Sequence, residues 1–93
     1  MLCNVYSQTA DFVADTTKGC VPMQVSFTDL SSGTPVDWEW DMGDGSTPIY
    51  LQHPTYVYNH SGTFTVKLTV TYADSTKQTK TISNYINAST GPY

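Results

Sequence analysis

An alternating stretch that ends in a glycine-rich turn, residues 36–45, limits the fold of this chain more than any other segment. Its apolar residues are Val36, Trp38, Trp40 and Met42, and acidic residues stand between them at Asp37, Glu39 and Asp41. This period of two is typical of a strand with one buried and one solvated face. The alternation stops at Gly43-Asp44-Gly45, and Asp-Gly favours a tight hairpin turn with positive φ. We therefore expect a strand with Trp40 in the core, followed by a reversal of the chain.

Alternation of the same kind recurs along most of the sequence. It is clearest over residues 63–72, where Phe64, Val66, Leu68, Val70 and Tyr72 alternate with threonine and lysine. The other expected strands are 8–15, 22–28, a short peripheral 46–52, 54–58 and 76–88, with polar turns at 16–19, 59–62 and 73–75 and a crossing loop at 29–35. In the last strand the alternation slips between Ile82 and Ile86, which indicates a bulge. With no helical period present, the pattern predicts an all-β fold, an antiparallel β-sandwich of about seven strands in two sheets.

Length and charge limit the number of domains and the classes of partner that this chain can have. The 93 residues suffice for one domain, which we expect at 8–88 between an N-terminal lead (1–7) and a C-terminal linker (89–93). A net charge of −4 with four Lys and Arg residues excludes a nucleic-acid partner, because no basic stripe can form. No apolar run is long enough to insert into a membrane. We expect a monomeric module.

Cys3 and Cys20 are the two cysteines. If 16–19 forms a hairpin turn, Cys3 lies about a dozen residues from Cys20 along the strand, roughly 40 Å at strand spacing. Bridged Cα atoms lie only about 6 Å apart. An internal disulfide would require residues 1–7 to fold back, so free thiols or a bond to a neighbouring domain are the favoured alternatives.

Several motifs in a fixed order resemble the polycystic-kidney-disease (PKD) repeat, an immunoglobulin-like extracellular domain. Residues 38–45 resemble its Trp-Asp-Phe-Gly-Asp-Gly signature, with Met42 in place of Phe. Gly19 with 22–32, Pro54 with Tyr58, and 62–70 resemble its other stretches, so the resemblance covers Phe12 to Ile86. Its structural signature falls on Trp40, Asp41, Gly43, Asp44, Gly45, Tyr58 and Gly62. The hydroxyl of Tyr58 is expected to tie down a corner of the sandwich.

The resemblance implies a module without enzymatic activity in a surface or secreted protein. Such a module acts as a rigid spacer and as a protein-interaction or adhesion domain, with neighbouring domains and other surface proteins as partners. The alternative is an accessory carbohydrate-binding module of a secreted hydrolase. A polysaccharide would then stack on exposed aromatic rings, for which the candidates are Trp38, Tyr50, Tyr56 and Tyr85.

Other candidate sites have plainer explanations. Asp41 and Asp44 could form an acid/base pair, but a role as acceptors for turn amides is simpler. Calcium, which some collagenase-attached relatives bind, would suit Asp29, Asp37, Asp41 or Asp44. However, the Asp-x-Asp-Gly loop of those relatives is replaced here by 31–35. We expect no other cofactor. His53 and His60 are expected in loops, and Asn59 and Asn87 begin N-glycosylation triplets.

Overall fold

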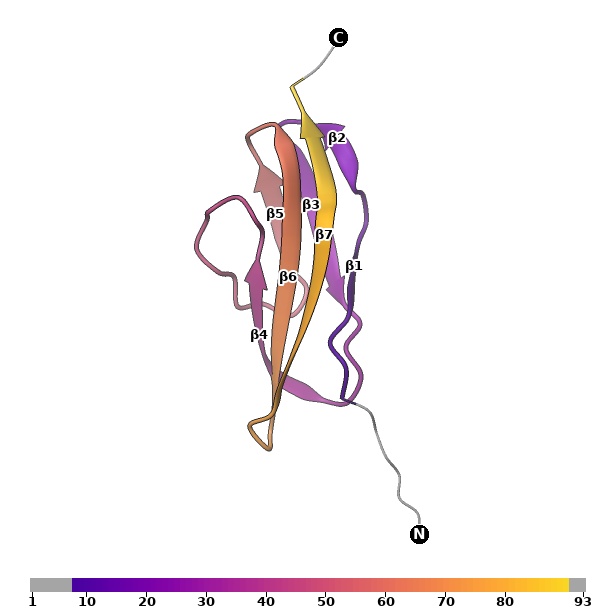
Figure 1. The fold of residues 1–93 in the computed structure, drawn as a ribbon, viewed down its shortest axis with the longest axis vertical. Helices are drawn as coiled ribbons and strands as arrows, with labels where there is room; N and C mark the ends of the chain where they lie inside the picture. Colours follow the sequence, from indigo (N-terminus) through magenta and orange to yellow (C-terminus); the bar gives the residue numbers. More distant parts are fainter. Residues whose placement is uncertain (1–7, 91–93) are drawn as a thin grey trace.

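The computed structural model describes residues 8–90 and is a two-layer sandwich of strands (Figure 1). The strands are β1 (Phe12–Ala14), β2 (Lys18–Cys20), β3 (Met23–Asp29), β4 (Pro35–Asp41), β5 (Thr55–Tyr58), β6 (Gly62–Tyr72) and β7 (Lys77–Ser89). One sheet has the order β1-β3-β5 and the other β2-β7-β6-β4. The predicted fold class, seven strands in two sheets, is therefore confirmed. Between residues 8 and 90 there is no helix of the length and apolarity that crossing a membrane requires.

The core lies between the two sheets around Trp40, whose side chain is completely buried. Its ring centroid lies 5.1 Å from that of Phe12 and 5.3 Å from that of Phe27, both on the facing sheet. The strand periods supply the rest of the core: alternate residues of β3 and β6 are buried, namely Met23, Val25, Phe27, Val66, Leu68, Val70 and Tyr72. The prediction that Trp40 lies between two sheets is confirmed.

The bulge in the last strand is also confirmed. Phe64 pairs with Ile86, but two residues further along β6, Val66 pairs with Ile82, four residues back along β7. The additional residues of β7 are accommodated where Asn84 adopts a φ of 53°. Asparagine tolerates this left-handed conformation better than most residues. The bulge thus lets both Ile82 and Ile86 pack against the core.

The predicted polar turn at 16–19 is wrong in part, because Lys18 and Gly19 belong to β2. This strand leaves the sheet of β1 and pairs with β7 of the other sheet, in parallel, with Gly19 opposite Ala88. The backbone continues the contact: Asn87 donates to the carbonyl of Thr17 at 2.7 Å, and Val21 donates to Ser89 at 2.8 Å. The sandwich is therefore antiparallel except at this one pair of strands.

Two details near the central strand also differ from expectation. Val36, expected on the buried face, is 50% exposed, because a register shift between Pro35 and Asp37 removes it from the alternation. The expected strand at 46–52 is reduced to one bridge, in which Ile49 and Trp40 exchange hydrogen bonds of 2.8 and 3.0 Å. The chain therefore reverses through a wide loop rather than a tight hairpin.

The expected lead and linker on either side of the domain fall largely outside the described residues. The lead at 1–7, which contains Cys3, lies outside the described residues, as do 91–93. Cys20 is exposed at the end of β2 and forms no disulfide among residues 8–90. β7 continues to Ser89, one residue beyond the expected domain boundary.

Candidate functional site

The signature residues form the loop that follows β4. Asp41 Oδ1 accepts a hydrogen bond from the backbone of Gly43 at 3.0 Å, and Asp44 Oδ1 accepts one from Ser46 at 3.1 Å. Gly43 and Gly45 both have a φ of 84°, a conformation that glycine adopts without steric cost. Each acidic residue therefore bridges its own turn to an amide two residues later, as short polar side chains commonly do.

Tyrosines of β5 hold this loop against the sandwich. Tyr58 is fully buried and donates its hydroxyl to the carbonyl of Met42 at 2.8 Å, while Tyr56 donates to the second carboxylate oxygen of Asp44. Burial raises the pKa of Tyr58, and the nearby Asp44 adds to the effect. Burial also acts to raise the pKa of Asp44, but its hydrogen bonds with Tyr56 and Ser46 outweigh this and lower it. Asp44 is thus an ionised anchor of the loop, and each of its oxygens accepts a hydrogen bond within the protein.

The four aromatic candidates for carbohydrate contact do not form one row. Trp38 belongs to β4 and donates its indole N–H to Asp29 at 2.9 Å. Tyr85 belongs to β7, and its hydroxyl accepts the amide of Ala14 at 2.8 Å. Tyr56 lies on the other sheet. Tyr50 alone among the four is widely exposed, at 67%, in the loop before β5.

Asp29 is a centre of side-chain contacts that the sequence did not mark as such. Its carboxylate accepts hydrogen bonds from Ser31, from the indole of Trp38 and from the Gln52 amide, at 2.9, 2.9 and 3.3 Å. Its own amide donates to His53 Nδ1 at 3.1 Å. Burial acts to raise the pKa of Asp29, but these hydrogen bonds outweigh it and lower the pKa. The sequence did offer one signal for these contacts. A serine stands two residues after an aspartate at a strand end, and such an aspartate commonly accepts a hydrogen bond from the amide two residues later.

The other polar candidates are separate from one another. No three His, Cys, Asp or Glu residues within 8–90 are grouped as metal ligands would be, and Asp29 already uses both oxygens within the protein. His53 and His60 are exposed, and so are Asn59 and Asn87. Asn87 lies within β7, and its side-chain oxygen accepts a hydrogen bond from Thr63 at 3.3 Å.

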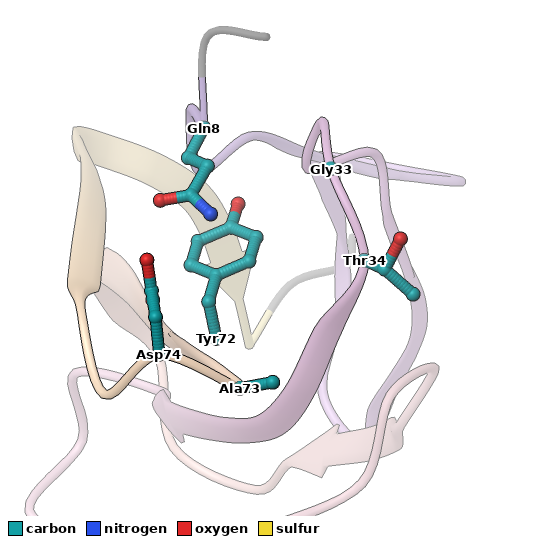
Figure 2. Close-up of a pocket in the computed structure, with 6 residues that line it drawn as sticks. All are labelled: Gln8, Gly33, Thr34, Tyr72, Ala73 and Asp74. Carbon is teal, nitrogen blue, oxygen red and sulfur yellow. The ribbon is translucent and has the colours of Figure 1, made fainter.

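The structure adds one concavity, of about 700 Å³, at the pole where the described chain begins (Figure 2). It is lined by Gln8, Gly33, Thr34, Tyr72, Ala73 and Asp74. Tyr72 forms the floor, but only 3% of this residue is exposed, and its hydroxyl donates to Ser32 at 2.6 Å. Asp74 accepts hydrogen bonds from the hydroxyl and amide of Thr76. The concavity is open and its lining is of mixed polarity, and its lining residues contain no nucleophile paired with a base.

Comparisons with known proteins agree with the fold. The model of the PKD domain family matches residues 7–87. The collagenase ColA of Bacillus cereus is 36% identical over 69 residues, which is 67% of this chain but 7% of the collagenase. This chain therefore spans a small part of that relative.

Solved structures give the same result. The PKD1 domain of the Vibrio cholerae metalloprotease PrtV superposes with a TM-score of 0.73 at 25% identity, covering 87% of this chain and 98% of that domain. The PKD1 domain of Vibrio anguillarum Epp gives a TM-score of 0.72 at 27% identity, over 88% and 95% of the two chains. A structure described as one of carbohydrate-binding modules from the β-sandwich superfamily gives 0.78 at 27% identity. That match covers 91% of this chain and 35% of the other.

Proposed function

This chain belongs to the PKD domain family, and from that premise we propose that it is a non-catalytic extracellular module that acts as a rigid spacer within a larger surface or secreted protein. In this role it also presents surfaces to neighbouring domains and other proteins, for interaction or adhesion. A collagenase and a metalloprotease are among the proteins with similar domains. These relatives favour a secreted peptidase as the parent protein.

The observation that carries the spacer role is the direction of the chain through the sandwich. Gln8 lies beside the turn after β6, with its side chain accepting a hydrogen bond from Thr76 at 2.9 Å. β7 ends at the opposite pole (Figure 1). Its 13 residues extend over about 43 Å at strand spacing. Force applied through the two ends of the domain therefore acts along the strands.

The pairing of β2 with β7 supports a load-bearing role. The two strands are parallel, β2 connects toward the N-terminal side, and β7 leads directly to the C-terminal side. Opposite forces on the two ends would slide these strands past each other, so their hydrogen bonds are loaded together rather than one after another. The hydrogen bonds of a parallel pair are evenly spaced and slanted between the strands, so sliding of the strands stretches all of them at once.

Single-molecule pulling of a tandem of this domain tests the proposal. We expect a high, uniform unfolding force when the domain is pulled through its two ends. We expect a clearly lower force when it is pulled through a cysteine placed at exposed Tyr50 and the C-terminal end, because that geometry does not load β2 against β7. Equal and low forces in both geometries would contradict a load-bearing spacer.

The second candidate is an accessory carbohydrate-binding module. It is favoured by the likeness to a structure of carbohydrate-binding modules and by the exposed ring of Tyr50, since aromatic faces stack on sugars. Retention of the domain on insoluble chitin or cellulose, lost in Tyr50→Ala and kept in Tyr50→Trp, would support it. Absence of retention on such glycans would remove it and would leave the spacer role untouched.

A further inference from the structure

The four-stranded sheet has an edge that its edge strand does not cover. β2 is nominally the last strand beside β7, but it has three residues and pairs only with Asn87, Ala88 and Ser89. β7 begins ten residues earlier, at Lys77. Figure 1 shows β2 beside the upper end of β7 only. Within residues 8–90, the lower half of β7 is therefore paired with β6 on one side and with no strand on the other.

The hydrogen-bond parity of the sheet identifies which groups point to this open side. The backbone N–H and C=O of Trp40 are bonded to Ile49, so these groups point away from β6. Trp40 and its β6 partner Leu68 therefore exchange no hydrogen bonds, and the N–H and C=O of Leu68 must point to β7. Tyr72, four residues further along β6, also directs its N–H to this side, because it donates to the carbonyl of Thr76 at 2.9 Å. It follows that Lys80 and Gln78, opposite Leu68 and Val70, bond to β6. The residues that direct their N–H and C=O groups outward are Lys77, Thr79 and Thr81.

Other strand edges of the sandwich are closed or shorter. On β1, the amide of Ala14 donates a hydrogen bond to the hydroxyl of Tyr85. On β4, Trp40 is paired with Ile49. β5 has four residues, and because Pro54 accepts from Phe27, only Thr55 and Val57 of this strand face outward. Lys77, Thr79 and Thr81 have exposed side chains, and no backbone partner exists for their outward groups among residues 8–90.

We propose that this open edge, residues 77–81, pairs antiparallel with the same edge of a second copy of the chain. A two-fold axis at Thr79 places Thr79 opposite Thr79 of the second copy and Lys77 opposite Thr81. Each of these pairs would exchange two hydrogen bonds. The sheets of both copies would then continue into one another.

This register keeps the lysines of the two copies from lying directly opposite each other. Lysines directly opposite each other would weaken the pairing, but Lys77 meets Thr81, and Lys80 meets Gln78. Lys80 is also near Asp11, at 3.9 Å, which offsets its charge. The bulge at Asn84 and the turn at Ser75, both with positive φ, end the flat edge on either side. The contact is consequently short and stops at two copies.

A contact of this size is weak in dilute solution, and it matters where copies are held close together. Three outward residues from each copy bury far less surface than a standard interface. A dissociation constant in the millimolar range is expected. Copies displayed next to one another on a surface gain from their high local concentration. Adhesion between neighbouring copies would then come from this edge, independently of the spacer role.

Amide NMR spectra of the domain over a concentration series from about 0.05 to about 2 mM test the proposal. We expect the amides of Lys77, Thr79 and Thr81 to shift and to become protected from hydrogen exchange as concentration rises. Thr55 and Val57, the outward residues of β5, are expected to stay unchanged. A monomer at every concentration, or shifts at β5 alone, would overturn the proposal.

Two variants locate the contact. Thr79→Pro removes an outward N–H without removing a bond to β6, so the fold is retained and pairing is lost; Val57→Pro is the matched change on the β5 edge and should leave pairing intact. Thr79→Lys keeps the backbone and places two lysines opposite each other. It should weaken self-association about two- to fivefold at low salt, with recovery at high salt. Self-association that persists in Thr79→Pro and is lost in Val57→Pro would overturn the assignment.

Discussion

Two glycines in the loop after β4 have the same backbone conformation and different surroundings. Gly43 and Gly45 both have a φ of 84°. A Cβ atom on Gly43 would lie 2.1 Å from the carbonyl oxygen of Thr65, whereas a Cβ on Gly45 would have no atom within 4 Å. Backbone strain is therefore common to both positions, but only Gly43 is also limited by a close backbone approach.

This difference gives a matched pair of substitutions. Gly45→Ala should lower the free energy of unfolding by about 1–2 kcal/mol, the cost of left-handed backbone for a residue with Cβ. Gly43→Ala should lower it by more than about 3 kcal/mol, because the loop must also move away from β6. Urea denaturation of the two variants measures the difference. Equal losses would show that the approach of Gly43 to Thr65 does not restrict the loop.

Asp29 ties three segments together through a nearly buried carboxylate. In Asp29→Asn, one of the two oxygens becomes an amide, so either the Ser31 amide or the Trp38 indole loses its acceptor. We expect a loss of about 1–3 kcal/mol, the cost of a buried donor without a partner. Asp37→Asn, on the exposed face of β4, is the control and should change stability by less than about 0.5 kcal/mol.

The same carboxylate predicts a pH dependence. The pKa of Asp29 in the folded protein lies below its ordinary value of 3.8, so the unfolded chain binds its proton first as the pH falls. The stabilisation from Asp29 is therefore fully present above the unfolded value and is lost as the pH falls through the folded pKa. Wild-type protein should lose stability more steeply below about pH 4 than Asp29→Asn does. Thermal unfolding between acid and neutral pH measures this, and parallel curves would contradict it.

At the scale of the element, β5 fastens the loop after β4 across the sandwich. Tyr58 is fully buried and its hydroxyl bonds to the carbonyl of Met42. Tyr58→Phe keeps the ring stacked on Phe64 but leaves that carbonyl without its donor, which should cost about 1–3 kcal/mol. Val57→Thr, on the exposed side of the same strand, should cost less than about 1 kcal/mol. A Tyr58→Phe variant as stable as the wild type in urea would mean that the carbonyl finds another donor.

Elements with a strict period could be predicted from sequence, and elements defined by distant partners could not. The alternation in β6 and the slip between Ile82 and Ile86 are local properties, and both were confirmed. β2 carries the sequence Lys-Gly-Cys, which has no strand period. It becomes a strand only because β7 supplies partners almost seventy residues later. The exposure of Val36 has a similar origin, in a register shift against β6.

The candidate site shows the same limit. The turn residues Asp41, Gly43, Asp44 and Gly45 stand together in the sequence, and their hydrogen bonds are mostly local. Asp29 acquires its partners from Trp38 and Gln52, and the concavity at the pole combines Gln8, Gly33 and Asp74. Residues that are assembled from separate segments leave no spacing signal in one sequence. The exposure of an aromatic residue is equally hard to predict from sequence. Trp38 is half-buried and Tyr50 is exposed because different segments pack against them in the fold.

At the scale of the whole molecule, resistance to force should depend on the parallel pair more than on the core. Thr17 accepts from Asn87 and Ser89 accepts from Val21, so by alternation Gly19 directs its backbone groups to β7, and Lys18 directs its own away. Gly19→Pro removes a bond of the parallel pair, while Lys18→Pro removes an N–H that β7 does not use. Pulled through its ends, Gly19→Pro should unfold at a clearly lower force than Lys18→Pro. If the two unfold at the same force, the strands that resist stretching lie elsewhere in the sandwich, with β1 and β3 as the next pair to test.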